Sequence, residues 1–140
     1  MKRAARVLAM PMLLLLSSGS VMASTDPSQR PRPPQPVQRD PAAPAGTGVA
    51  AQDDAYTLSS KAGYKHVPVF DNDTFPDGVQ VSWTEPEGGA LYFTPDCSGK
   101  GSCFYFDSYG FYGGGSAAFE YTLSSADGTT STAKVLMQFQ

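Results

Sequence analysis

Apolar and polar residues alternate along the C-terminal two thirds of the chain. In the stretch VQVSW, the apolar residues Val79, Val81 and Trp83 are separated by single polar residues, and the stretches FEYTL (119–123) and STAKVLMQFQ (131–140) follow the same period. A period of two is typical of β-strands that bury one face. Shorter stretches of this kind lie at 55–58, 64–67, 90–94 and 102–106. The pattern therefore predicts seven strands.

The segments between these strands are rich in residues that form turns. They read FPDG, EPEGG, CSGKG, GGG and SADGT, and no stretch shows a convincing helical period. Glycine, proline and aspartate favour tight reversals of the backbone. Seven short strands with regular turns predict an all-β fold over residues 50–140, an antiparallel β-sandwich of immunoglobulin-like type.

Aromatic residues are concentrated in the stretch GSCFYFDSYGFYGGGS (101–116). If residues 102–106 form a strand, neighbouring side chains point to opposite faces. We expect Cys103 and Tyr105 to face the core and Phe104 and Phe106 to face outward. The predicted binding surface then combines the outward rings with tyrosines of the neighbouring segments: Tyr92, Phe104, Phe106, Tyr109 and Tyr112.

The first 23 residues have the pattern of a secretory signal peptide. Basic residues come first, an apolar run follows from Val7 to Leu16, and small residues precede the expected cleavage after Ala23. The apolar run is about half the length of a membrane-spanning helix, and no second run follows it. We therefore expect a secreted or periplasmic protein without membrane insertion after cleavage.

Residues 24–49 contain seven prolines and no aromatic residue. Such a composition buries too little apolar surface to fold, and proline at this density favours extended polyproline II. We expect a disordered, semi-rigid tether between the signal peptide and the domain.

Export also changes the interpretation of the two cysteines. Cys97 and Cys103 are separated by five residues that include two glycines. Oxidising compartments permit disulfides, so we expect a bridge across this loop.

The mature chain is acidic. Removing residues 1–23 takes away three of ten basic groups and none of thirteen acidic ones, which leaves a net charge of −6. Nucleic acids are bound through basic surfaces, so we expect no nucleic-acid partner.

Carboxylates and one amide gather in AQDDAY and FDNDTFPDG: Asp53, Asp54, Asp71, Asn72, Asp73 and Asp77. Oxygen atoms of this kind are the ligands that calcium takes. Aspartate and asparagine are also ordinary turn residues, and the EF-hand pattern is absent. These residues therefore suggest a calcium site that is weak or absent, and no other cofactor.

The order of the motifs DDAYTL, VFDNDTFPDG, GGALYFTPD and GFYGGGSAAFEYTL resembles the bacterial immunoglobulin-like and cadherin-like repeats of RTX-type adhesins and VCBS-type surface proteins. The resemblance implies a β-sandwich with a structural or adhesive role, in which calcium stiffens junctions between modules. Phe75 and Val79 stand where acidic residues are usual, and this sequence carries one copy. Both departures weaken the expectation of calcium.

Enzyme motifs are not evident. His66 is the only histidine, and the elbow of serine hydrolases is missing. One histidine and two bridged cysteines supply too few ligands for zinc. We therefore expect a secreted, non-catalytic binding or structural module, adhesin-like, at the cell surface, in the periplasm or outside, with a protein or a glycan as partner. The alternatives are a carbohydrate-binding protein that uses the aromatic surface, and a small exported enzyme or enzyme inhibitor.

Overall fold

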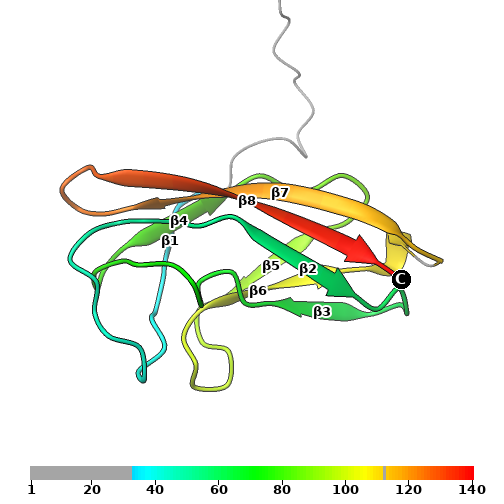
Figure 1. Ribbon diagram of the computed structural model, residues 1–140, viewed down its shortest axis with the longest axis horizontal. Coiled ribbons are helices and arrows are strands. Elements are labelled where there is room, and N and C mark those ends of the chain that lie inside the picture. The colour runs from blue at the N-terminus through cyan, green and yellow to red at the C-terminus, as the bar shows by residue number, and fades with distance from the viewer. Residues whose placement is uncertain (1–32, 112) are drawn as a thin grey trace, which may run out of the picture.

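Two β-sheets packed face to face form the fold (Figure 1). The computed structural model describes residues 33–111 and 113–140. The five-stranded sheet has the order β1-β4-β7-β8-β2, and the three-stranded sheet has the order β3-β6-β5. The strands are β1 (Gln35–Pro36), β2 (Asp54–Leu58), β3 (Tyr64–Val67), β4 (Gln80–Trp83), β5 (Leu91–Thr94), β6 (Cys103–Asp107), β7 (Gly115–Ser124) and β8 (Thr130–Phe139). A short 3-10 turn, η2 (Tyr109–Phe111), follows β6.

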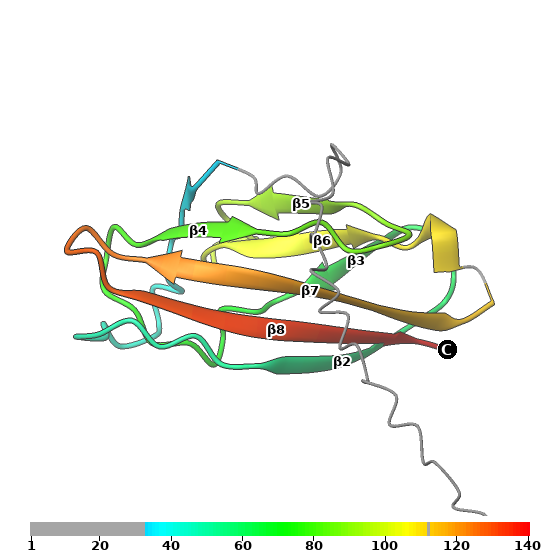
Figure 2. The same ribbon diagram turned by 90° about the horizontal axis from the view of Figure 1, so that it is seen from above.

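This arrangement confirms the predicted immunoglobulin-like sandwich. All but one of the strand pairs are antiparallel, and β7 and β8 form a long hairpin of ten residue pairs (Figure 2). The exception is β2, which runs parallel to β8 from Asp54↔Val135 to Leu58↔Phe139. Within the described part of the chain, no helix is long and apolar enough to cross a membrane.

The core lies between the sheets and is strongly aromatic. The ring of Phe104 is central, with centroids 5.0 Å from Trp83, 5.5 Å from Phe119 and 5.7 Å from Phe70. A second group of rings closes the other end, where Phe106 lies 5.4 Å from Phe139. Edge-to-face and offset contacts at these distances add to the stabilisation from burial.

The predicted orientation of the β6 side chains is wrong. Phe104 and Phe106 are fully buried in the core, whereas Tyr105 is only partly buried on the opposite face. The reason is chemical: a phenylalanine ring has no polar atom to satisfy, while a tyrosine hydroxyl keeps its solvation when it faces outward. Cys103 shares the outer face with Tyr105 but is covered at its disulfide loop.

The predicted disulfide between Cys97 and Cys103 is present. The loop that it closes is fastened to the N-terminal segment, because Ser102 N donates to Gln38 O (2.8 Å) and Gln38 N donates to Ser102 Oγ (2.8 Å). Gly101 has a positive φ of 83°, and a Cβ there would lie 2.5 Å from Gln38 O. Only glycine permits this close approach.

The boundary predicted between tether and domain at residues 49 and 50 is too late. β1 pairs with the edge of β4, and the side chain of Val37 is buried in the core. Pro36 is tolerated because an edge strand does not need every N–H. A bridge between Ala50 and Thr74 ties the end of the segment to the domain. Residues 1–32, which include the predicted signal peptide and the first part of the tether, lie outside the described residues.

Candidate binding pocket and binding face

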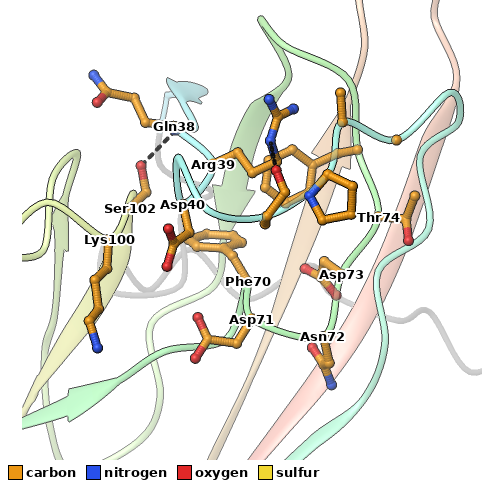
Figure 3. A pocket seen from close by; sticks show the side chains of 15 residues that line it. Gln38, Arg39, Asp40, Phe70, Asp71, Asn72, Asp73, Thr74, Lys100 and Ser102 are labelled. Carbon is orange, nitrogen blue, oxygen red and sulfur yellow. Dashed lines mark hydrogen bonds between the residues drawn. The ribbon is translucent and has the colours of Figure 1, made fainter.

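A pocket of about 530 Å³ opens at one end of the sandwich (Figure 3). Three segments far apart in the sequence form it: residues 38–46, the loop 70–75, and the disulfide loop at Lys100 and Ser102. Its polar side chains include Arg39, Asp40, Asp71, Asn72, Asp73 and Lys100, and the ring of Phe70 also lines it. The volume is within the usual range for small-molecule sites.

Several of these polar groups already have partners in the protein. Arg39 Nη1 lies 2.9 Å from Asp77 Oδ1, and Arg39 Nε donates to Ala43 O (3.1 Å). Asp40 Oδ1 accepts from Ala42 N (2.8 Å). Arg39 and Asp40 therefore hold the N-terminal segment in place through these contacts.

Two carboxyl groups beside the pocket have raised pKa values. The pKa of Asp73 is raised to about 6, mainly because the carboxyl group is partly buried. Two hydrogen bonds oppose this effect: the Tyr121 hydroxyl donates to Asp73 Oδ2 (2.7 Å), and Gln52 N donates to Oδ1 (2.8 Å). Burial also raises the pKa of Asp54 to about 6, and the charge of Asp73 adds to the effect. Asn72 Nδ2 donates to Asp54 Oδ1 (3.0 Å) and opposes it.

The structure brings only some of the calcium candidates together. Asp54, Asn72 and Asp73 adjoin one another, and the charge of Asp71 also acts on Asp54. In contrast, Asp53 Oδ1 accepts from Lys134 N (2.8 Å). Asp77 binds Arg39, as described above. Among the described residues, no three carboxylates bring their oxygens within 4.8 Å of one another. Weak calcium binding stays a prediction.

The outer face of the three-stranded sheet carries a group of tyrosines, which we call the tyrosine face: Tyr64, Tyr92, Tyr105 and Tyr109. Tyr64, Tyr92 and Tyr109 are 59%, 48% and 63% exposed. The register places His66, Tyr105 and Tyr92 in one row across β3, β6 and β5. The rings of Tyr64 and Tyr92 meet edge to face with centroids 5.4 Å apart, although their strands lie on either side of β6.

The tyrosine face is compact enough for its members to influence one another. The pKa of Tyr64 is raised chiefly by the charge of Tyr92, and Asp107 and Tyr109 add to the effect. Of the predicted binding surface, Tyr92 and Tyr109 are exposed and lie close to Tyr64. Phe104 and Phe106 are instead buried in the core. Tyr112 lies outside the described residues.

Sequence reasoning missed Tyr64 and Tyr105. The signal that could have found them is the kind of aromatic residue in each strand. In YKHV, LYFT and CFYF, the tyrosines face outward, and the phenylalanines, Val67 and Leu91 face the core; Cys103 is the apolar exception on the outer face. Three adjacent strands with the same preference indicate a sheet with one solvent-exposed face and one buried face.

Comparison with protein-family models places the described fold among known modules. The model described as bacterial Ig domain matches residues 41–138, which is more than half of the chain. Comparison with curated proteins and with solved structures finds no match. The matched region contains β2 to β7, all of β8 except Phe139, and the disulfide loop; β1 lies before it. The chain belongs to the bacterial Ig domain family.

Proposed function

We propose that this protein is a secreted, non-catalytic binding module, adhesin-like, that contacts its partner through the tyrosine face. The observation that carries the proposal is the exposure of Tyr64, Tyr92 and Tyr109 on one side of a buried aromatic core. Tyrosine is enriched at protein interfaces because its ring buries apolar area while its hydroxyl finds a polar partner.

Family membership supports the non-catalytic part of the proposal, because bacterial Ig domains are typically structural modules. The chain also has one histidine, His66, and both of its cysteines are bridged. The alternative of a small exported enzyme or enzyme inhibitor would need a reactive group or a protruding inhibitory loop, and residues 33–111 and 113–140 provide no specific support for either.

A protein is the better-supported partner, and a glycan is the alternative. Stacking on sugars requires flat, exposed rings with polar groups beside them. The rings of Tyr64 and Tyr92 are inclined at 83°, so they do not form a common flat platform. Such a ridge suits interdigitation with side chains of a partner. His66 and Asp107 nevertheless provide polar groups next to the rings, which keeps the glycan alternative open.

The predicted signal peptide and the proline-rich segment complete the proposal. A secreted or periplasmic location follows from the basic and apolar pattern of residues 1–23. The prolines before Gln35 would hold the module at a distance from its attachment or neighbour. The acidic character of the mature chain makes nucleic acids and anionic membrane surfaces poor partners.

The test is a binding measurement on the mature protein with a matched control on the other sheet. In the test variant, Tyr64→Ser is combined with Tyr92→Ser. The control is Leu136→Ser, because Leu136 is 49% exposed but belongs to the five-stranded sheet. We expect saturable binding of labelled wild-type protein to an envelope preparation of the producing bacterium, a loss of about tenfold or more in the tyrosine variant, and no change in the control.

Treatment of the envelope separates the two partner classes. If protease abolishes binding and periodate does not, the partner is a protein. If periodate abolishes binding and protease does not, the glycan alternative replaces it. Equal binding by the wild type and the tyrosine variant, or no saturable binding at all, would refute the tyrosine face as the contact surface.

A further inference from the structure

A histidine lies directly beside the disulfide. One ring nitrogen of His66 and the Sγ atoms of Cys97 and Cys103 all lie within 4.8 Å of one another. His66 is exposed, whereas Cys97 and Cys103 are 8% and 1% exposed. Within the described residues, this is the one place where three histidine, cysteine or carboxylate side chains approach so closely.

The strand register explains the approach. His66 of β3 pairs with Tyr105 of β6, and Cys103 lies two residues before Tyr105 on the same outer face. His66 and Cys103 are therefore diagonal neighbours across the ladder. The turn at 97–101 then brings Cys97 back to Cys103, with their Cα atoms 6.0 Å apart. Residues from two strands and one loop are thus fixed by the fold around one point.

We propose that, when the disulfide is reduced, His66, Cys97 and Cys103 form a site for one soft divalent cation such as Zn²⁺. Thiolates and imidazole are the donors that zinc prefers. Two cysteines and one histidine, with water in a fourth position, make a complete tetrahedral set of the open kind. The disulfide-bonded protein lacks this site because its sulfurs are bonded to each other.

The histidine is already placed for a shared cation, and the sulfurs need to separate. Zinc–sulfur and zinc–nitrogen bonds of about 2.3 and 2.0 Å imply donor separations of about 3.5–3.8 Å in a tetrahedron. The histidine nitrogen is already within 4.8 Å of both sulfurs. The sulfurs must move apart from about 2 Å, the length of the bond between them, and after reduction we expect rotation about the Cα–Cβ bonds to supply this movement.

Opening the site is a two-electron reduction by a dithiol. A thiolate of the reductant attacks the Sγ of Cys97, the more exposed cysteine, and forms a mixed disulfide while Cys103 leaves as a thiolate. The second thiolate of the reductant then attacks the reductant's first sulfur, which is bonded to Cys97 in the mixed disulfide. This closes a disulfide within the reductant and releases Cys97 as a thiolate. The two electrons pass from the reductant to the protein, and metal binding displaces any protons that the cysteine thiolates take up.

The consequence is that the loop 97–103 can be closed in two ways. In the oxidised chain a covalent bond closes it, and in the reduced chain the cation replaces that bond and adds β3 through His66. Metal binding to the folded chain stabilises it, because the unfolded chain does not hold the three donors together.

The experiment uses Co²⁺ as a spectroscopic substitute for Zn²⁺ with the mature protein, after reduction by a water-soluble phosphine. We expect reduced wild type to bind one Co²⁺ with sulfur-to-cobalt charge-transfer absorption, and the oxidised protein to show no such absorption. His66→Gln should weaken binding by at least about tenfold, since losing even an outer partner of a metal ligand costs about 10–100-fold. Lys100→Gln, in the same loop but outside the donor trio, should bind as the wild type does.

Fluorescence of Trp83, the only tryptophan, shows whether reduction unfolds the domain. If it does, Zn²⁺ should restore the folded emission of the wild type but not of His66→Gln. The proposal is overturned if reduced wild type shows no charge transfer, if His66→Gln binds as tightly as the wild type, or if Zn²⁺ fails to restore an unfolded wild type.

Discussion

The two faces of the three-stranded sheet carry aromatic residues of different kinds. The inner face has Phe93, Phe104 and Phe106, whereas the outer face has the tyrosine face described above. Both residue types have rings of similar size, so apolar area alone does not decide the side. The hydroxyl decides, because burying it without a partner costs free energy.

Tyr121 shows that a tyrosine can be buried when its hydroxyl has a hydrogen-bond partner. It is a tyrosine with no exposed surface, and it belongs to the five-stranded sheet. Its hydroxyl donates to Asp73 Oδ2 (2.7 Å), and Val69 O lies 3.3 Å away. A tyrosine is therefore buried in this fold where a carboxylate is positioned to accept its hydrogen bond.

Truncating one ring on each face should affect the stability of the domain very differently. Phe104→Ala should lower the free energy of unfolding by about 3–5 kcal/mol, because it removes a fully buried ring at the centre of the core. Tyr105→Ala should cost no more than about 1 kcal/mol, because its ring is partly solvated. Urea unfolding of both variants, followed by Trp83 fluorescence, measures the difference. Equal costs would contradict the assignment of faces.

Cys103 is the one apolar residue on the outer face of β6, and its bridge to Cys97 contributes to stability. Reduction in the absence of metal should cost about 2 kcal/mol, as expected for a short loop, and should lower the melting temperature by roughly 10 °C. Thermal unfolding with and without reductant measures this. The non-reduced protein should show no free thiol, and quantitative alkylation of Cys97 and Cys103 would disprove the bridge.

The carboxyl groups beside Tyr121 test the cost of burying charge. Because the pKa values of Asp54 and Asp73 are raised to about 6, above about 4 in an unfolded chain, the folded state binds protons more tightly between these values. Stability should therefore rise as the pH falls from 7 towards 4.5 and level off below about 4. After allowance for solvent screening, the gain should be on the order of 1 kcal/mol.

Variants separate this effect from the titration of other groups. Asp54→Asn should reduce the pH dependence of the melting temperature, with the contribution of Asp73 remaining, whereas Glu87→Gln, at an exposed turn position, should leave it unchanged. A wild-type stability that falls steadily from pH 7 to 4.5 would contradict the prediction.

Calcium should have the smallest effect. Oxygens of Asp54, Asp73 and Asp77 already accept bonds from Asn72, Tyr121 and Arg39. We therefore expect a dissociation constant no tighter than about millimolar and almost no change in melting temperature at lower concentrations. Calorimetric titration measures this. Micromolar binding that Asp73→Ala or Asp77→Ala abolishes would be the opposite result.

The strands could be predicted from the sequence because alternation is a local property. Six of the predicted ranges match β2 to β6 and β8 within a residue or two, while β7 begins at Gly115, before the predicted residue 119. The side of each β6 residue could not be predicted in the same way. In CFYF every residue is apolar or aromatic, so alternation gives no preference between two registers of opposite face.

The role of residues 35–49 and the end pocket depend on contacts that are distant in sequence. Gln38 bonds to Ser102, sixty-four positions away, and nothing in the local composition indicates that partner. The prolines of the segment suggested an unfolded tether, but burial of Val37 and pairing with the edge of β4 add to these distant bonds and hold the segment on the domain. The tyrosine face likewise exists only once β3, β6 and β5 are placed side by side.

The parallel pairing of β2 with β8 gives the module a mechanical direction. When the chain is pulled between its N-terminal segment and Gln140, the force acts on the start of β2 and on the end of β8, which lie at opposite ends of the same ladder. The five residue pairs from Asp54↔Val135 to Leu58↔Phe139 are then loaded together in shear, once the β1 pairing and the other contacts of residues 35–50 have given way. A ladder loaded in this way resists force through all its hydrogen bonds at once, whereas a hairpin pulled open loses them one at a time.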